Sequence, residues 1–179
     1  LVIRPQFYTE SMDNKLTVTV MDGKKKVAEK TVNACNENIV VLPIKKAKLW
    51  SPESPFLYDV NYTVKDKDGN VIDEVKSYAG MRKVHLANGY FYLNNQSYYQ
   101  RLVLDQGFYP DGLYTAPTDE RLKKDITDSL ALGFNGARLH QKVFEPRFLY
   151  HADKLGYLVW DETGNWGWGH NDKINLFTF

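Results

Sequence analysis

The first part of the chain alternates between apolar and polar positions with a period of two. The clearest example is Leu-Thr-Val-Thr-Val at residues 16–20. Such alternation is typical of a β-strand that buries one face. Turn sequences at Asp22–Gly23 and Asp68–Gly69 indicate tight hairpins between such strands. The predicted strands are residues 16–20, 27–32, 39–42, 58–64 and 71–78. Short strands at this spacing predict an all-β sandwich of immunoglobulin type over residues 1–82.

The rhythm changes after a predicted hairpin around Asn88–Gly89. Three predicted strands, at 101–104, 134–139 and 157–160, alternate with two amphipathic stretches, and the third strand is almost wholly apolar. Thr118 is a predicted N-cap of the first helix and Gly133 its end, while Pro146 and Gly156 bracket the second helix. This order predicts parallel strands alternating with helices.

No Gly-x-Gly-x-x-Gly pattern follows any of these strands, which disfavours a dinucleotide-binding sheet. Residues 83–179 are therefore predicted to form the first part of a TIM (β/α)₈ barrel. A complete barrel needs roughly 250 residues, and three strands would leave an open edge. We expect the natural protein to continue beyond Phe179, and we expect self-association of the isolated chain, as a homo-oligomer, through that edge.

Composition excludes several classes of partner. Lys and Arg number 23 against 22 Asp and Glu, so charge gives no basis for binding nucleic acid or an anionic membrane. The chain has no apolar run approaching the roughly 20 residues that span a bilayer. The single cysteine, Cys35, lacks the partners of a metal site, and we predict no metal and no cofactor. The compartment stays open, a periplasmic or secreted location included.

Polar residues follow each of the three predicted barrel strands, where barrels carry their functional groups. The candidate substrate-binding residues are Asp105, Arg138, His140, Asp161, Glu162 and Trp166. Each has a structural alternative, such as an ion pair for Arg138 or a hydrophobic plug under a loop for Trp166. An aromatic content of 14% suits stacking on sugars, although β-rich proteins also use such residues on strands. His151, in mid-helix, is predicted to lie on the surface.

Hydrolysis of a glycoside generally needs two carboxyl groups placed across the scissile bond. Asp161 and Glu162 are adjacent on a strand end, so their side chains should point in opposite directions. We therefore assign no catalytic residue within this chain.

Four strings of residues, 49–58, 80–84, 133–138 and 157–162, resemble sequences of glycoside hydrolase family 2. This family contains β-galactosidases, β-glucuronidases and β-mannosidases. The resemblance implies a retaining mechanism with two glutamates, both of them beyond residue 179. It also implies that Arg138 is the arginine of the second strand, which lies near the nucleophile. The chain departs from many members at 102–106 and 138–142, segments that help to bind sugar, so the sugar is left open.

The leading hypothesis is a fragment of a retaining glycosidase that removes terminal β-linked sugars from oligosaccharides or glycoconjugates. Its partners would be the carbohydrate substrate and the remainder of the parent chain, and the fragment alone would be inactive. The alternative is a non-catalytic carbohydrate-binding or assembly module. A lyase or isomerase would need a metal or phosphate site, for which the sequence offers no candidate.

Overall fold

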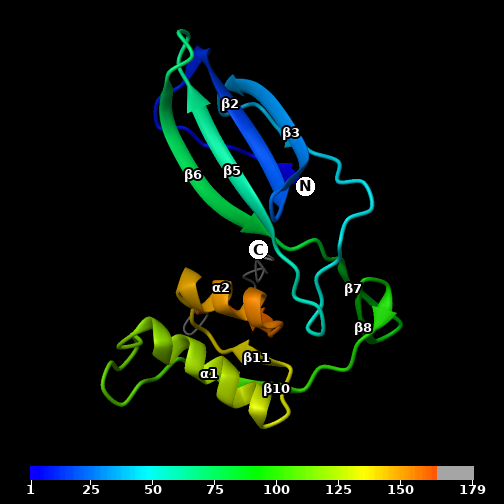
Figure 1. Cartoon of the computed structure of the whole chain (residues 1–179). Helices are drawn as coiled ribbons and strands as arrows, with labels where there is room; N and C mark the ends of the chain where they lie inside the picture. The colour runs from blue at the N-terminus through cyan, green and yellow to red at the C-terminus, as the bar shows by residue number, and fades with distance from the viewer. Residues whose placement is uncertain (165–179) are drawn as a thin grey trace, which may run out of the picture. The chain divides into compact units, whose positions relative to one another are not determined.

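The computed structural model describes residues 1–164, and the chain divides into two units (Figure 1). The first unit consists of Leu1–Leu49 and Phe56–Met81. The second consists of Trp50–Pro55 and the residues from Arg82 onward.

The first unit is built on a four-stranded antiparallel sheet with the order β3-β2-β5-β6. Its strands are β2 (Ser11–Asp22), β3 (Lys25–Ala34), β5 (Tyr58–Lys65) and β6 (Val71–Ala79), and a short pair is formed by β1 (Val2–Ile3) and β4 (Val40–Val41). The predicted alternation is confirmed in β2, where Leu16, Val18 and Val20 are buried. On the opposite face, the Thr17 and Thr31 hydroxyls are 2.8 Å apart. One apolar face and one polar face make this a sandwich-like unit.

The core of the first unit lies between the large sheet and the β1–β4 pair. Val40 and Leu42 belong to the same buried cluster as Leu16 and Val60. Leu16 pairs with Val64 across β2 and β5, so the apolar positions of the two strands share one face. A shift of one residue would expose that face, and burial therefore fixes the register.

The second unit contains two small sheets and two helices. An antiparallel sheet is formed by β7 (Val84–Ala87), β8 (Tyr90–Leu93) and β9 (Gln96–Ser97), with the predicted turn at Asn88–Gly89 between the first two. A parallel sheet has the order β10 (Leu102–Asp105), β11 (Gly136–Leu139), β12 (Leu158–Asp161). The helices are α1 (Asp119–Ala131) and α2 (Pro146–Leu155).

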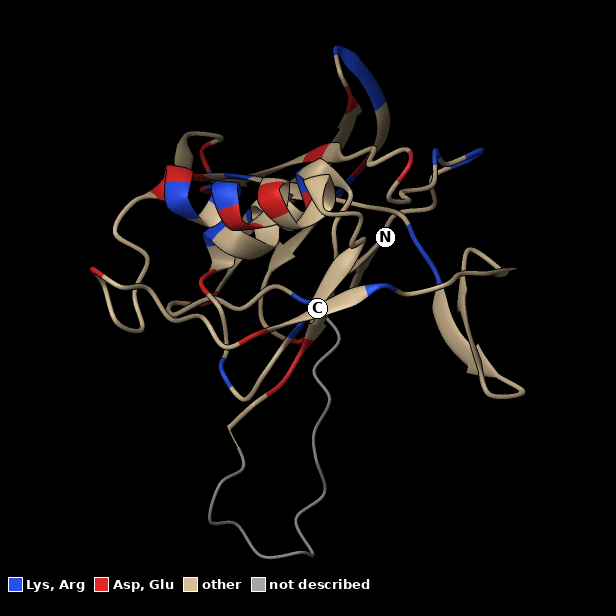
Figure 2. Ribbon diagram, turned by 90° about the horizontal axis from the view of Figure 1, so that it is seen from below, with Lys and Arg blue, Asp and Glu red and all other residues tan. Residues whose placement is uncertain are grey.

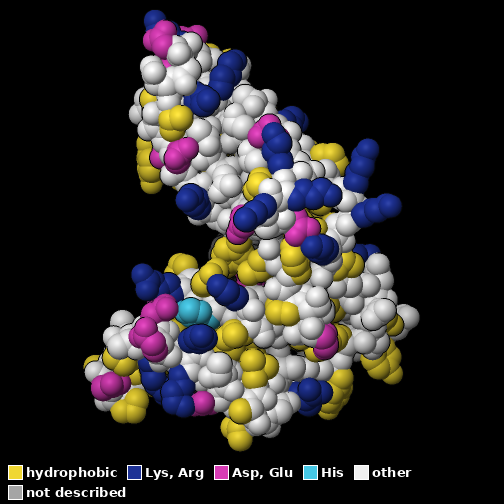
Figure 3. Space-filling view, viewed as in Figure 1, with side chains coloured by type: hydrophobic (Ala, Val, Ile, Leu, Met, Phe, Trp, Pro, Cys, Tyr) yellow, Lys and Arg dark blue, Asp and Glu magenta, His cyan; other side chains and the backbone are white. Residues whose placement is uncertain are grey.

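The helix ends fall where the sequence predicted them. The Thr118 hydroxyl accepts a hydrogen bond from the Arg121 amide at 3.2 Å, as an N-cap should. Pro146 is the first residue of α2, and Gly156 ends it with a left-handed backbone. Along α1, acidic residues stand at the start and again in the second half, with basic residues between them (Figure 2). Charged side chains of both signs are interspersed on the face seen in Figure 3.

Both helices pack against one face of the parallel sheet. Ile126 of α1 and Phe148 of α2 share a buried cluster with Ala137 and Leu139 of β11. The other face carries Leu104, Arg138 and Trp160, three residues paired in register across the sheet and about half exposed.

The segment Trp50–Pro55 belongs to the second unit because one buried aromatic ring, that of Trp50, packs there. Trp50 is 1% exposed, and its indole N–H donates to the Asp153 carbonyl at 2.6 Å. The Arg82 guanidinium lies 4.5 Å from the centre of the Trp50 ring and forms an ion pair with Asp153 at 2.8 Å. The Asn94 side chain donates to the Trp50 carbonyl at 2.9 Å. A single large aromatic residue therefore joins this segment to α2 and to the β7–β9 sheet.

The prediction for His151 was wrong. Its side chain is only 13% exposed, and Nε2 lies 3.1 Å from Asp119 Oδ2. Asp119 opens α1, so the imidazole is covered on the side of α2 that meets the start of the other helix. Periodicity within α2 alone could not indicate this contact.

Candidate functional site at the carboxyl ends of the parallel strands

The three parallel strands end together at one edge of their sheet. Asp105, Leu139 and Asp161 are neighbours in the registers that pair β10 with β11 and β11 with β12. Just beyond these ends lies a hollow of about 240 Å³, lined by Gln106, Phe108, Tyr114, His140, Gln141 and Lys142. The predicted residue His140 therefore lines a hollow next to the carboxyl ends of the parallel strands.

Arg138 and Glu162, two predicted site residues, form an ion pair. Arg138 Nε lies 2.5 Å from Glu162 Oε1, with the arginine side chain 50% exposed and the glutamate 18% exposed. The hydrogen bond from Arg138 lowers the pKa of Glu162, and the same bond raises the pKa of Arg138. This arrangement keeps Glu162 ionised and leaves half of a permanent cation accessible to a polar ligand.

Asp161 has different surroundings from its neighbour. Its Oδ1 atom is buried and has no hydrogen-bond partner among residues 1–164. Burial raises the pKa of Asp161, and the negative charge of Glu162 raises it further. Adjacent carboxyl groups with pKa values shifted in opposite directions are common where a site performs chemistry on a polar ligand.

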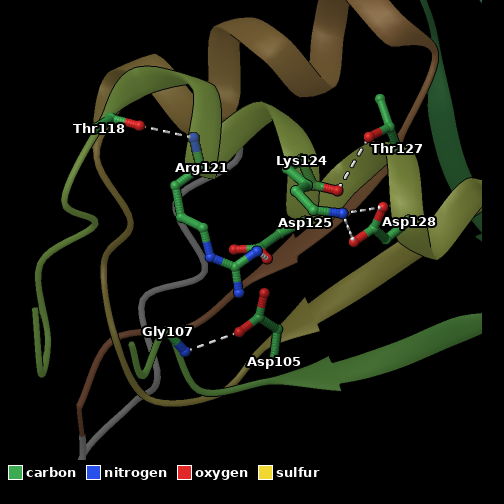
Figure 4. A network of polar contacts seen from close by, with 8 residues as sticks. All are labelled: Asp105, Gly107, Thr118, Arg121, Lys124, Asp125, Thr127 and Asp128. Carbon is green, nitrogen blue, oxygen red and sulfur yellow. Dashed lines mark hydrogen bonds and ion pairs between the residues drawn. The ribbon is translucent and has the colours of Figure 1, made fainter. Parts of the chain in front are cut away.

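Asp105 anchors the loop that follows β10. Its Oδ1 atom accepts a hydrogen bond from the Gly107 amide at 2.8 Å, and its carbonyl accepts the His140 amide at 2.8 Å. Figure 4 shows its carboxyl group close to the Arg121 guanidinium, which pairs with Asp125 at 2.7 Å. Burial raises the pKa of Asp125, and the charge of Asp105 adds to the shift. Asp105 therefore fixes the start of the β10–α1 loop, residues 106–118, and does not line the hollow.

Lys142 lines the hollow but was not among the candidate residues of the sequence analysis. Its ammonium donates to the carbonyls of Gly107 at 3.1 Å and Tyr114 at 2.6 Å, two points of the β10–α1 loop. It also lies 4.8 Å from the centre of the Phe144 ring. The sequence offered one signal, because segment 138–142 departs from the sequences of many family members. The contacts themselves could not be predicted, because they join residues 28 and 35 positions apart.

Phe108 and Tyr114 were also missed. Both line the hollow, each is 57% exposed, and their ring centres lie 4.4 Å apart. The loop lacks any periodic pattern that would mark these two positions. Trp166, the last predicted site residue, lies outside the described residues.

A larger hollow, of about 330 Å³, lies in the first unit. Its lining includes Phe7, Tyr8 and Asp73 but none of the predicted site residues. The smaller hollow is the better candidate for a ligand-binding site because His140 lines it and it adjoins the strand ends. The larger volume of the other hollow does not by itself indicate binding.

Residues 1–164 contain no group of three or more His, Cys, Asp or Glu side chains placed to hold a metal ion. Across the same residues, no helix is both long and apolar enough to cross a membrane. The polar groups that gather at the strand ends are arginine, aspartate, glutamate, histidine, glutamine and lysine side chains, which suit hydrogen bonding to a polyhydroxylated ligand.

Comparison with known proteins gives the class to which the chain is similar. Residues 6–82 match the family model described as glycosyl hydrolases family 2. The predicted resemblance to this family is therefore confirmed, and the relatives below extend the similarity past residue 82.

Two curated relatives cover most of the chain. A putative β-glucuronidase of Formosa agariphila is 31% identical over 173 residues, which is 90% of this chain and 20% of that protein. A β-galactosidase of Pseudoalteromonas haloplanktis is 26% identical over 161 residues, 83% of this chain and 15% of that protein. The chain thus spans a fifth or less of the length of these relatives.

A solved structure supports the fold. The glycosyl hydrolase family 2 member from Bacteroides cellulosilyticus superposes with a TM-score of 0.72 at 27% identity, covering 84% of this chain and 22% of that chain. Relatives bearing glycosidase names, together with the family model, place the chain among glycoside hydrolase-like sequences.

Proposed function

We propose that this chain is part of a retaining β-glycosidase and contributes to binding of the sugar that the enzyme cleaves. The observation that carries the proposal is the Arg138–Glu162 ion pair beside the hollow lined by His140, at the carboxyl ends of parallel strands. The family resemblance and the glycosidase names of the relatives support the reaction class. Its substrates would be terminal β-linked sugars of oligosaccharides or glycoconjugates.

We further propose that residues 1–82 are an immunoglobulin-like sandwich and residues 83–179 the beginning of a (β/α)₈ barrel. The strand order β10-β11-β12 is consecutive and parallel, and both helices cover the same face. Helices on one face only are expected of a barrel wall, since a doubly wound sheet would place them on both. Leu104 and Trp160, 53% and 44% exposed on the other face, would then point toward the barrel interior.

In this proposal Arg138 and His140 bind the substrate directly. The guanidinium also orients Glu162, whose pKa it lowers, so that an ionised carboxylate faces the ligand. Asp161, whose pKa burial raises, would lie next to Glu162 among the groups that bind the sugar. Trp166 remains a predicted stacking residue. The catalytic acid/base and nucleophile would come from the remainder of the parent chain.

The test is hydrolysis of a panel of chromogenic α- and β-glycosides by the full-length gene product, with the 179-residue chain assayed alongside. Cleavage of a β-glycoside by the full-length protein and none by the chain would support both the reaction class and the missing carboxyl groups. Turnover by the chain alone would contradict the assignment of catalysis to other residues.

A second candidate is a carbohydrate-binding module without catalysis, which the hollow in the first unit favours. Tyr8 on its rim is fully exposed, and the neighbouring Gln6 and Asn14 offer amide groups for hydrogen bonds. Absence of turnover with every glycoside, combined with sugar binding that a Tyr8→Ala variant loses, would support this candidate.

A further inference from the structure

The loop between β11 and α2, residues 140–145, contains a residue with a strained backbone. Gln141 has φ of +52°, in the left-handed region that side chains other than those of asparagine and aspartate rarely adopt. We propose that Gln141 is a positioning residue, whose left-handed backbone aims its amide at Glu162 and fixes the orientation of that carboxylate at the strand ends. This inference rests on the proposed function because Glu162 faces the ligand there.

Three other left-handed residues of the second unit have an ordinary explanation. Asn88, Asn94 and Asn95 lie in the turns of the β7–β9 sheet, and asparagine tolerates this region. Glutamine has no such preference, and Gln141 follows a parallel strand, where no tight hairpin demands positive φ. Strained backbone persists only where the surroundings fix it, and it gathers at functional sites. The conformation of Gln141 therefore calls for a function.

Hydrogen bonds fix the chain on both sides of Gln141. The His140 amide donates to the Asp105 carbonyl at 2.8 Å. The Lys142 ammonium binds two carbonyls of the β10–α1 loop. Both neighbours of Gln141 are thus held by the end of β10 and the loop that follows it, and these contacts maintain the strained conformation between them.

The left-handed backbone brings Gln141 against the segment that follows β12. The Glu162 carboxylate accepts a hydrogen bond from the Gln141 amide and another from Arg138 Nε at 2.5 Å. On the opposite side of the same residue, a Cβ atom built on Gly164 would lie 3.4 Å from the Gln141 carbonyl oxygen. Residues 162–164 therefore contact Gln141 at its amide and at its carbonyl.

A second donor changes what the carboxylate can do. Arg138 alone would leave Glu162 free to turn about a single contact, whereas the Gln141 amide restricts that rotation. A group that is oriented before the ligand arrives loses less entropy on binding. His140 and Asp161 are further titratable groups whose charges interact with Glu162, and neither is altered by a substitution at position 141.

The experiment measures the pKa of Glu162 in the full-length gene product by carbon NMR of glutamate labelled at the carboxyl carbon, with Glu162→Gln to identify the signal. Valine rarely adopts positive φ, so Gln141→Val should turn the amide away from the carboxylate. We expect the pKa of Glu162 to rise toward its ordinary value, because one hydrogen bond to the ionised form is lost. On the β-glycoside that the protein cleaves best, kcat/KM should fall by about tenfold or more.

Two variants at the same position separate the backbone from the side chain. Gln141→Asn and Gln141→Gly keep the amide and accept the left-handed conformation, so the pKa of Glu162 should stay lowered in both. Leu113→Val is the matched control for strain, because Leu113 has φ of +54° but its amide donates to the Tyr109 carbonyl. It should leave the pKa of Glu162 unchanged.

An unchanged pKa of Glu162 in Gln141→Val would overturn the inference. So would a raised pKa in Gln141→Gly, which would assign the effect to the side chain; if the valine variant does not fold, the glycine variant decides by this criterion. Failure of the full-length protein to hydrolyse glycosides would contradict the proposed function, whereas the titration of Glu162 needs no turnover and still tests the contact with Gln141.

Discussion

Gly156 is the residue at which substitution by alanine tests the packing of Trp50–Pro55 most sharply. Gly156 ends α2 with φ of +76°, and a Cβ atom built on it would lie 2.9 Å from both the carbonyl carbon and Cα of Pro52. Real Cβ atoms essentially never approach so closely, and backbone atoms cannot rotate away as a flexible side chain can. Either the loop or the end of the helix must therefore move in a Gly156→Ala variant.

Two costs add in this variant. A non-glycine residue in the left-handed region costs about 1–2 kcal/mol, and forcing an extra carbon into a packed site costs about 1–3 kcal/mol. We expect a loss of about 2–5 kcal/mol of unfolding free energy for the second unit. With a urea dependence of about 2 kcal/mol per molar, the midpoint should fall by about 1–2.5 M. Tryptophan fluorescence is a suitable probe, because Trp50 and Trp160 both belong to this unit.

Gly133→Ala separates strain from steric conflict. Gly133 follows α1 with φ of +90°, but a Cβ atom there would have no neighbour within 4 Å. Only the conformational cost of about 1–2 kcal/mol should appear. Equal midpoint shifts in the two variants would refute the claim that Pro52 packs against the end of α2.

Three further predictions concern side-chain contacts of the second unit. Tyr157→Phe leaves the buried Ser129 hydroxyl without its partner at 2.7 Å, so urea unfolding should show a loss of about 1–2 kcal/mol of unfolding free energy. The double variant with Ser129→Ala should lose less than the sum of the two single variants, and additive losses would contradict the contact. The hydrogen bond with His151 lowers the pKa of Asp119 below 3.8, so the stabilisation that the ionised carboxylate gives is present above that pH and is lost as the pH falls through the lowered pKa. The unfolding free energy of Asp119→Asn should therefore depend less on pH between about 2 and 5 than that of the unaltered chain. An unchanged pH profile would count against the hydrogen bond. Lys142→Met keeps the apolar stem of the side chain but removes two hydrogen bonds to the β10–α1 loop. Amide hydrogen exchange in this loop should accelerate about tenfold, while exchange in α2 stays unchanged. Equal acceleration in the loop and in α2 would indicate general destabilisation and contradict the prediction.

Local signals in the sequence predicted the secondary structure of this chain well. The period of two in residues 16–20 predicted a buried face, and the structure buries Leu16, Val18 and Val20. Pro146 and Gly156 bracketed α2 because their backbone preferences act within a few residues. Such features need no knowledge of the rest of the molecule.

Contacts between distant segments could not be read from the sequence. Trp50 was recognised only as part of a motif, yet its indole N–H bonds to a carbonyl 103 positions away. In the sequence nothing distinguishes Lys142 from a surface lysine, whereas in the structure its ammonium binds carbonyls of the β10–α1 loop. His151 was misassigned for the same reason, because its partner Asp119 lies on another helix. Side-chain periodicity reports which face of an element is buried and not what lies against it.

Part of the candidate site followed from position alone. The rule that barrel strands present functional groups at their carboxyl ends selected Arg138, His140 and Glu162. The structure brings Arg138 and Glu162 together as an ion pair and places His140 in the adjoining hollow. Their part in binding sugar stays a prediction. Phe108 and Tyr114 were outside the rule because loop conformation, which carries no periodic pattern, decides where they lie.

The most direct test of the account measures kcat/KM of the full-length gene product on the β-glycoside that it cleaves best, with Arg138→Lys beside Arg147→Lys. Arg138 pairs with Glu162 at the strand ends, whereas Arg147 is 75% exposed on α2. A lysine cannot reproduce the planar guanidinium contact, so Arg138→Lys should lower kcat/KM by about 100-fold, and Arg147→Lys should change it less than about twofold. Equal activity of the two variants would contradict the claim that this edge of the sheet binds the substrate of a glycosidase.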